Sequence, residues 1–222
     1  MALSLHEKVE IGRRVRLENS TTKEFAICER YGLEQVGGSQ TKVDGWRGDR
    51  NWSIKNATSS STQVHLTTGR KFIEDFSLTD GKSDDFVRKF FGHIDFNHKD
   101  RNRYKMSEID KESVKAFSEF LNENKKRLVE YVISGLDGKF GITDVLYNYK
   151  GTHLHATANE IYDIVDECEW LLNDTTFHLK RKSDNKTMFH FQMKGSGNKA
   201  KMGYHAVLCH IHKNLFIKPE ER

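Results

Sequence analysis

The stretch from Val43 to Asn56, VDGWRGDRNWSIKN, predicts two strands joined by a polar turn, with an acid on the first strand and a lysine on the second. Its turn letters, WRGDRN, separate two short strand-like segments, as in a β-hairpin. Ser53 and Lys55 are two residues apart, so they are expected to share one face of the second strand. Trp52 is then expected on the opposite, buried face.

The segments around this hairpin predict an α/β fold. Upstream, TTKEFAICERYG is typical of a helix, with Thr21 as N-cap, Glu24 three residues later and Gly32 at its end. Downstream, polar and apolar residues alternate in STQVHLTT, which predicts a third strand. The rest predicts two short helices (GRKFIEDFSL, SDDFVRKFFG), a long helix over about 109–134, strands TDVLYNYK and THLHATA, a helix NEIYDIVDECEWLL, a hairpin TTFHLKRKSDNKTMFHFQMK and a last strand YHAVLCHIHKNLF. We expect a mixed central sheet flanked by helices, with an added C-terminal β-hairpin region.

Composition favours one folded domain over residues 1–222. Hydrophobic residues make up 36% and charged residues 31% of the chain, and no apolar run approaches the roughly 20 residues of a membrane span. The N-terminal residues do not resemble a signal peptide, so we expect a soluble, cytoplasmic protein with no membrane partner. Three well-separated cysteines, Cys28, Cys168 and Cys209, suit reduced thiols.

Positive charge is concentrated near the C-terminus. The net charge is only +4, but between His178 and Gly203 seven cations face one acid, Asp184. Such a local excess is typical of a phosphate-facing surface. We therefore expect residues of about 140–222 to bind DNA.

The hairpin carries groups suited to phosphodiester hydrolysis. This reaction needs a metal ion to neutralise developing charge and groups that align the phosphate. Carboxylate oxygens such as those of Asp44 are ligands for Mg²⁺, and an amine such as that of Lys55 can polarise the phosphate. For each residue a simpler interpretation exists, because Asp44 can begin a turn and Lys55 can be a solvated strand lysine.

Asp44, eight intervening residues and the triplet Ser53-Ile54-Lys55 resemble the metal-binding hairpin of the PD-(D/E)XK nuclease superfamily. Together with the helix bearing Glu24 and the hydroxyl-rich ATSSSTQVHLTT, they resemble a type II restriction endonuclease over residues 20 to 80. The resemblance implies Mg²⁺-dependent, sequence-specific cleavage of double-stranded DNA by a homodimer, in host defence paired with a methyltransferase. It assigns Asp44 and Glu24 to the metal and Lys55 to the phosphate. Ser53, the fourth candidate catalytic residue, stands where the family usually has an acid. The resemblance thus implies a catalytic core over residues of about 20–80.

The second metal ligand has two candidates. Family members often carry a glutamate on the helix before the catalytic strands, which favours Glu24. The same residue completes a capping box with Thr21, a role that needs no catalysis. Glu29 is the other candidate on this helix.

Two groups of polar residues are candidates for DNA contacts. Short hydroxyls and free amides after the catalytic strand can bind phosphate oxygens, and amides and cations of the C-terminal hairpin can reach phosphates or base edges. Each group also suits an ordinary solvated surface. The candidates are Ser59, Ser60, Ser61, Thr62, Gln63, His65, Lys180, Arg181, Lys182, Gln192, Lys194, Asn198 and Lys199.

Several alternatives remain open. Gln192 and Lys194 form a second Q-x-K triplet, which would place the metal with Asp184 or Asp174. A DNA-binding protein on a nuclease-like scaffold would need no metal. An RNA-directed nuclease would need exposed stacking aromatics, for which the candidates are Tyr147, Tyr149 and Tyr204. The paired histidines near Cys209 show no zinc-finger spacing, which argues against a zinc site.

Overall fold

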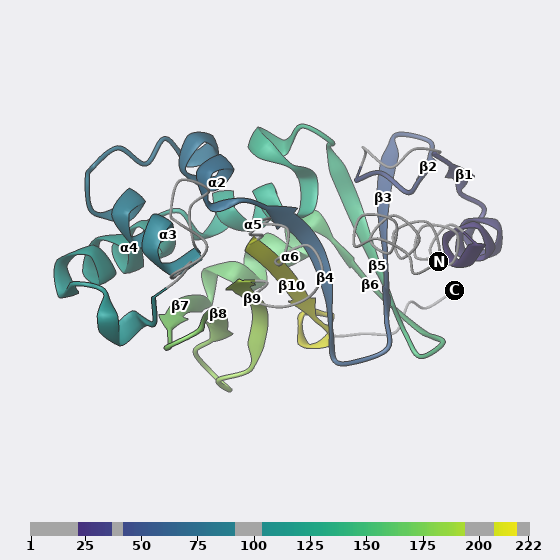
Figure 1. The fold of residues 1–222 in the computed structure, drawn as a ribbon. Helices are drawn as coiled ribbons and strands as arrows, with labels where there is room; N and C mark the ends of the chain where they lie inside the picture. Colours follow the sequence, from purple (N-terminus) through teal and green to yellow (C-terminus); the bar gives the residue numbers. More distant parts are fainter. Residues whose placement is uncertain (1–21, 37–41, 92–103, 194–206, 217–222) are drawn as a thin grey trace, which may run out of the picture.

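The computed structural model describes residues 22–36, 42–91, 104–193 and 207–216, shown in colour in Figure 1. Two five-stranded sheets form the centre of this part of the chain. The first has the order β1-β2-β3-β5-β6, with bounds Glu34–Gln35, Gly45–Arg47, Arg50–Ala57, Ile142–Tyr149 and Thr152–Thr157. The second has the order β4-β10-β9-β8-β7, with bounds Ser61–Thr67, Val207–His212, Thr187–Met193, Thr176–Arg181 and Cys168–Leu172.

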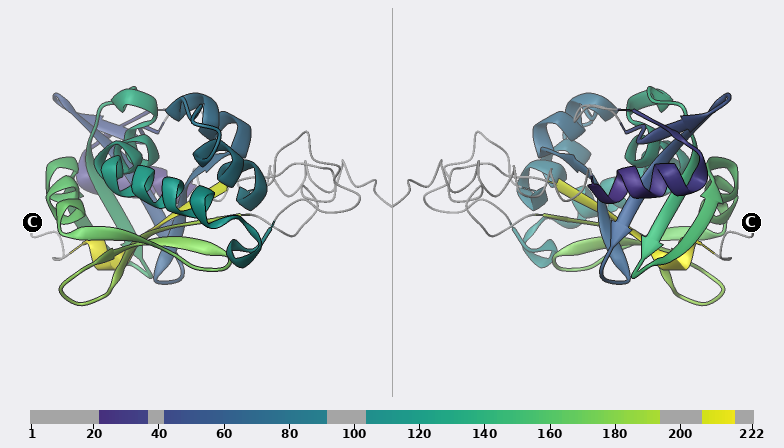
Figure 2. Two further views of the ribbon diagram at one scale, coloured as in Figure 1. Left: turned by 90° about the vertical axis from the view of Figure 1, so that its left-hand side faces the viewer. Right: turned by 90° about the vertical axis from the view of Figure 1, so that its right-hand side faces the viewer.

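The helices cover both sheets. A helix over residues 22–31, purple in Figure 2, lies across one face of the first sheet. The other helices are α2 (Gly69–Phe76), α3 (Ser83–Phe91), α4 (Lys111–Glu123), α5 (Lys125–Ser134) and α6 (Ala158–Asp166). Single 3-10 turns lie at η1 (Met106–Glu108), η2 (Leu136–Gly138) and η3 (Lys213–Leu215). Of the helices described, none is long and apolar enough to cross a membrane.

The first sheet is mixed, as expected. Its strands pair antiparallel except β3 and β5, which run parallel in the register Ser53↔Val145 and Lys55↔Tyr147. A parallel neighbour needs a long crossover, and here the crossover contains β4 and helices α2 to α5. The predicted α/β class with a mixed sheet and flanking helices is confirmed.

The β2–β3 hairpin forms as predicted. Gly45 pairs with Trp52 and Arg47 with Arg50, so the turn consists of Gly48 and Asp49. Gly48 has φ of +62°, a left-handed conformation that glycine adopts without steric cost. Asp44 lies one residue before β2 rather than within it, but its N–H still donates to the carbonyl of Trp52 at 2.8 Å.

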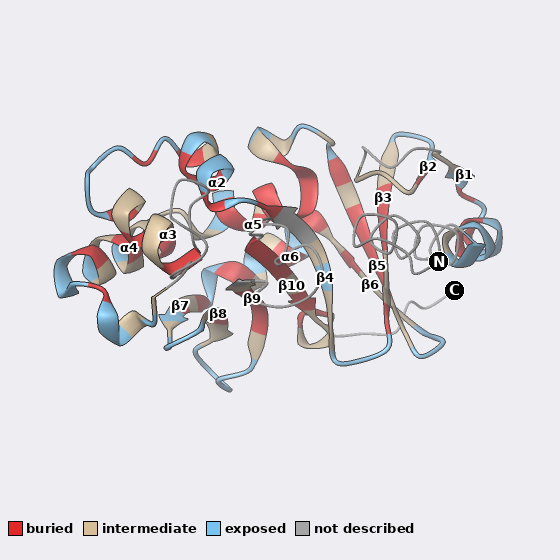
Figure 3. Ribbon diagram, viewed as in Figure 1, coloured by how far each residue is buried: buried red, intermediate tan, exposed pale blue. Residues whose placement is uncertain are grey.

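Side chains of β3 alternate between two apolar layers. Trp52 and Ile54 are buried beneath the helix over residues 22–31, with Cys28 and Leu146 in the same cluster. Ala57 faces the larger core that the two sheets share with α2 to α6. Residues 52–54 and Ala57 of β3 are buried, and the other residues of the strand are half-buried, as the red and tan segments of β3 in Figure 3 show.

The pairing of one strand and the boundaries of two helices differ from the sequence predictions. The strand STQVHLTT, β4, does not join β3 but pairs with β10 in the second sheet. The helix predicted over 109–134 is two helices, because Asn124 has φ −106° and ψ 19° between α4 and α5. The helix predicted from Asn159 to Leu172 ends at Asp166, and Cys168–Leu172 forms β7 because it pairs along β8.

The C-terminal hairpin is likewise part of the second sheet rather than an appendage. Strands β8 and β9 form the predicted hairpin, and β10 adds to its other edge before pairing with β4. The region predicted for DNA recognition is therefore joined to a strand from the predicted catalytic core.

Candidate active site

One oxygen of Asp44 collects three donors from β3. Its Oδ2 accepts hydrogen bonds from the Ile54 N–H at 2.6 Å and from the Ser53 hydroxyl at 3.3 Å. The Lys55 ammonium donates to the same oxygen at 3.3 Å. The acid and the lysine of the predicted hairpin therefore meet at one point.

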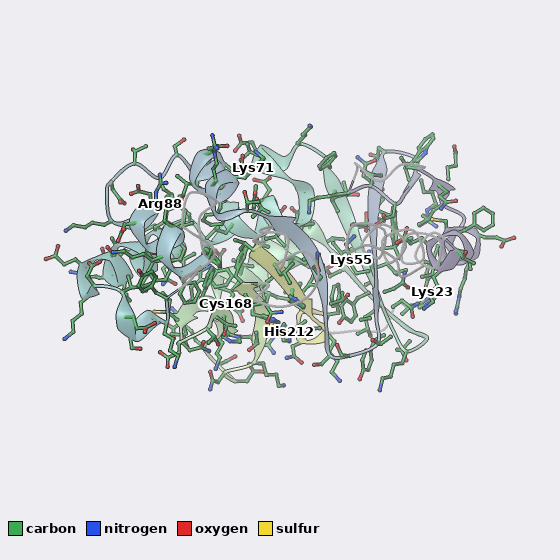
Figure 4. The ribbon with its side chains drawn as sticks, viewed as in Figure 1. Lys23, Lys55, Lys71, Arg88, Cys168 and His212 are labelled. Carbon is green, nitrogen blue, oxygen red and sulfur yellow. The ribbon has the colours of Figure 1, made fainter. Side chains whose placement is uncertain are left out.

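The hairpin register produces this convergence. Since Gly45 pairs with Trp52, Asp44 lies opposite Ser53 and on the same face as Lys55. The side chains of Lys55 and Asp44 keep 20% and 18% of their surface exposed, so the pair remains accessible to water. Figure 4 places Lys55 between β3 and β4. The pair thus lies where the first sheet meets the second.

The other oxygen of Asp44 is available for a ligand. Among the residues that the structure describes, no donor reaches Oδ1. Mg²⁺ is often bound through one or two carboxylates, with water and substrate phosphates completing its shell. Within the described ranges no group of three or more His, Cys, Asp or Glu side chains could hold a metal ion. Asp44 could offer one carboxylate oxygen to Mg²⁺, and the other ligands would then have to come from water and phosphate.

The hydroxyl of Ser53 contacts the carboxylate of Asp44. Ser53 is 1% exposed, and its hydroxyl donates the hydrogen bond. A neutral donor here adds no negative charge to the site.

Glu24 and Glu29 lie on the helix over residues 22–31, which packs against the Trp52 and Ile54 face of β3. Glu24 is one helical turn before Cys28, whose Sγ donates to the backbone carbonyl of Asp44 at 3.6 Å. Burial raises the pKa of Cys28 to about 11, with further contributions from the negative charges of Asp44 and Glu24. Glu29 is exposed and Glu24 is half-buried on this helix. Thr21, the predicted N-cap, lies outside the described residues.

Lys42 is a neighbour that the sequence did not single out. Its ammonium donates to the carbonyls of Val132 at 2.6 Å and Val64 at 3.3 Å. Burial, followed by the positive charge of Lys55, lowers its pKa to about 8. A lysine in a polar loop has no sequence signal that marks it, because its carbonyl partners come from distant elements.

The hydroxyl-rich loop between β3 and β4 uses part of its polar groups internally. The Ser59 hydroxyl donates to the carbonyl of Ser61 at 2.7 Å, and the Thr62 hydroxyl donates to that of Asn56 at 3.1 Å. These bonds close the turn. Residues 58–60 are exposed, and Gln63 is exposed on β4. Their predicted contacts with DNA stay a prediction.

Of the two acids considered for the rival hairpin, Asp184 lies far from Gln192, whereas Asp174 lies two residues before Thr176, the residue that pairs with Gln192. Asp184 lies in the β8–β9 turn, where Arg181 and Lys186 bind its carboxylate at 2.7 and 3.2 Å. Gln192 is five residues into β9 from Thr187, roughly 17 Å along the strand at 3.3 Å per residue. Asp184 and Gln192 are thus at opposite ends of the strand. Lys194 lies outside the described residues.

The predicted basic surface is only partly described. Lys180 and Arg181 are half-buried at the end of β8, and Lys182 is exposed. Arg181 is neutralised by Asp184, whose carboxyl pKa is held below its ordinary value mainly by that hydrogen bond. Asn198 and Lys199 lie outside the described residues. Of the tyrosines considered for RNA, Tyr147 is buried against Phe216 and Tyr204 is not described.

A row of histidines crosses the second sheet, and the sequence did not predict it. His210 on β10 pairs with His190 on β9, which pairs with His178 on β8. Gln63 on β4 lies on the other side of His210, and His212 donates to or accepts from His190 at 2.7 Å. The rings of His190 and His210 stack at 4.5 Å. The side chain of His65 is not described.

These histidines predict acid sensitivity. Burial, then the neighbouring imidazoles, lowers the pKa of His190 from 6.5 to about 3, and that of His212 to about 4. The unfolded chain takes up these protons below pH 6.5 while the folded chain does not, so stability is lost as the pH falls from 6.5 towards 4. We expect the free energy of unfolding to drop by about 1–3 kcal/mol between pH 7 and pH 5. Urea unfolding at pH 7 and at pH 5 measures this difference in the free energy of unfolding.

A glutamine variant provides the control for this prediction. Gln cannot be protonated, so His190→Gln should unfold with a smaller difference between pH 7 and pH 5 than the natural chain. An equal difference in both proteins would show that the histidine row is not its source.

A second buried carboxylate lies on the other face of β3. Asp144, on β5, is fully buried and accepts hydrogen bonds from Arg50, from the Thr143 hydroxyl at 2.7 Å and from His155 Nε2 at 2.7 Å. Burial alone would raise its pKa, but these bonds outweigh burial and lower it. His155 also stacks on Trp52 at 5.0 Å. The Asp144 partners Arg50, Thr143 and His155 come from β3, β5 and β6, so this carboxylate links the three strands.

The chain can be compared with known proteins. No protein-family model matches the chain, and no curated protein matches it in sequence. Among solved structures, it is similar to restriction endonuclease MspI in complex with its cognate DNA, with a TM-score of 0.43 and 10% sequence identity. The match covers 80% of this chain and 66% of that one, just under two thirds of its length. The roles of individual residues rest on the contacts described above.

Proposed function

We propose that this protein is a Mg²⁺-dependent endonuclease that cleaves phosphodiester bonds of double-stranded DNA. The observation that carries the proposal is the convergence of Asp44 and Lys55, whose carboxylate oxygen and ammonium lie 3.3 Å apart. An anionic metal ligand beside a cationic phosphate ligand is the minimal arrangement for this chemistry. The sequence resemblance to type II restriction endonucleases supports the same class of reaction.

Each residue of the hairpin has a defined task in this proposal. Asp44 would hold the metal, while the Ile54 N–H and the Ser53 hydroxyl fix the orientation of its carboxylate through Oδ2. Lys55 places a positive charge at the position of the attacked phosphate and stabilises its developing negative charge. Glu24 is the proposed second acid. Bound Mg²⁺ would supply further neutralisation of the phosphate and acidify water.

Double-strand cleavage adds a requirement for assembly. One Asp44–Lys55 centre serves one scissile phosphate, so two chains related by a two-fold axis would serve both strands of a symmetric site. We therefore include a homodimer and sequence-specific recognition in the proposal. As for other type II restriction enzymes, a methyltransferase would protect the host DNA.

Plasmid cleavage tests the proposal directly. Purified protein incubated with supercoiled plasmid is expected to produce discrete linear fragments with Mg²⁺ and none with EDTA. Asp44→Asn removes the charge that binds the metal and should lower the cleavage rate by at least about a hundredfold. Asp49→Asn is the matched control, because Asp49 is exposed in the turn of the same hairpin and should leave cleavage unchanged.

The same assay separates the alternatives. DNA that is shifted on a native gel but never cut, with Asp44→Asn equal to the natural chain, would favour the non-catalytic DNA-binding protein. Cleavage that survives Asp44→Asn but is lost in Gln192→Ala would move the metal to the rival hairpin.

A further inference from the structure

Lys42 connects three parts of the molecule that are distant in sequence. It lies two residues before Asp44, and its ammonium donates to Val132 on α5 at 2.6 Å and to Val64 on β4 at 3.3 Å. These bonds join the segment that carries Asp44 to helix α5, which leads into β5, and to strand β4 of the second sheet.

The carbonyls of Val132 and Val64 both lie where a helix or sheet provides no backbone hydrogen-bond donor. Val132 is in the last turn of α5, which ends at Ser134, and the last four carbonyls of a helix have no partner within the helix. A cation there also interacts favourably with the helix dipole. Lys42 therefore completes the C-terminal end of α5.

Val64 is the extra residue of a β-bulge. His65 pairs with Cys209 and Gln63 pairs with His210, so the register of β4 and β10 passes over Val64. The extra residue of a bulge is left out of the ladder, and bulges often lie beside active sites. The Lys42 ammonium binds the carbonyl of this residue.

The position of the Asp44 carboxylate depends on the position of the Asp44 backbone. Its N–H is fixed to Trp52 on one side, and Lys42 anchors the preceding segment on the other. A shift of this segment would move the Asp44 carboxylate away from the Ile54 N–H and Lys55, which bind it at 2.6 and 3.3 Å.

We propose that Lys42 is a positioning residue, which holds the Asp44 carboxylate against Lys55 by anchoring its segment to the bulge of β4 and the end of α5. The consequence for cleavage rests on the proposed function. The consequence for the position of Asp44 does not, because the Ile54 N–H reports that position without any reaction.

Two measurements on Lys42→Met test the proposal. Amide hydrogen exchange of Ile54 should become about tenfold faster or more, because its acceptor is no longer held in place. Single-turnover cleavage should slow by about 10- to 100-fold, since small misplacements of catalytic groups have effects of this size. The KM for DNA should change less than about threefold, because Lys42 does not contact the substrate. Lys42→Arg keeps the charge and should restore most of both properties.

Lys125→Met is the matched control. Lys125 also donates to two backbone carbonyls, those of Asp166 at 2.8 Å and Cys168 at 3.1 Å, but far along the chain from Asp44. It should lower the melting temperature without changing Ile54 exchange or cleavage. Should Lys42→Met not fold, Lys42→Gln retains one donor and carries the same comparison.

The outcomes are distinct. Unchanged Ile54 exchange in Lys42→Met, or an equal acceleration in Lys125→Met, would overturn the positioning role. If the natural chain cuts no DNA, the proposed function fails, and Ile54 exchange alone decides the role of Lys42.

Discussion

A Lys55→Met variant is expected to lose DNA cleavage by about a hundredfold to a thousandfold, the usual loss when one donor to a developing negative charge is removed. Methionine keeps the length and apolar character of the lysine stem but cannot donate to a phosphate oxygen. Among the residues that the structure describes, Asp44 is the one partner of the Lys55 ammonium, at 3.3 Å. The effect should therefore be on the chemical step.

Binding of DNA should change far less in the same variant. Many phosphate contacts share the binding energy, so the dissociation constant measured without metal should stay within about tenfold, or about 1.4 kcal/mol. Lys115→Met, on an exposed part of α4, is the control for loss of one positive charge. Full cleavage by Lys55→Met would remove this residue from the active site.

The largest loss of stability is expected from Asp144→Asn. Asp144 is 0% exposed and accepts hydrogen bonds from Arg50, Thr143 and His155. The amide of asparagine turns one acceptor into a donor and leaves Arg50 without its counter-charge. Removing one member of a buried ion pair usually costs about 3–5 kcal/mol, and because Arg50 is 40% exposed we expect about 2–4 kcal/mol.

Thermal unfolding measures this loss. For a chain of this size the melting temperature should fall by about 5–12 °C. The control is Asp166→Asn, which removes an ion pair with Lys126 in which both side chains are 53% exposed. Such surface pairs contribute about 0–1 kcal/mol, so this variant should unfold near the temperature of the natural chain. Equal shifts in the two variants would contradict the structural role of Asp144.

The candidate site was predictable because its geometry is local. A two-residue turn determines the register of β2 and β3, and the register places Asp44 opposite Ser53 and beside Lys55. The alternation of β3 likewise predicts that Trp52 is buried, which the structure confirms.

Features created by long-range pairing were not predictable in the same way. Strand β10 inserts between β4 and β9, so the row of Gln63, His210 and His190 exists only in the folded sheet. Lys42 finds its carbonyl partners 22 and 90 residues away. No local pattern encodes such contacts, because they depend on how whole elements pack.

The boundary errors have the same origin. The segment Cys168–Leu172 continues an apolar helical pattern in the sequence, yet it becomes β7 because β8 offers it a partner. Tertiary pairing here outweighs local propensity. In the helix predicted over 109–134, the apolar stripe was correct, and a single residue, Asn124, divides it.

The most direct test of the account is the position of a divalent ion in a complex with DNA. Crystals grown with Mn²⁺, whose anomalous scattering identifies it, should show the ion within about 2.0–2.5 Å of an Asp44 carboxylate oxygen. The Lys55 ammonium should contact a phosphate of the DNA at the same site. An ion bound beside Gln192 instead, or DNA bound with no ion at Asp44, would contradict the account.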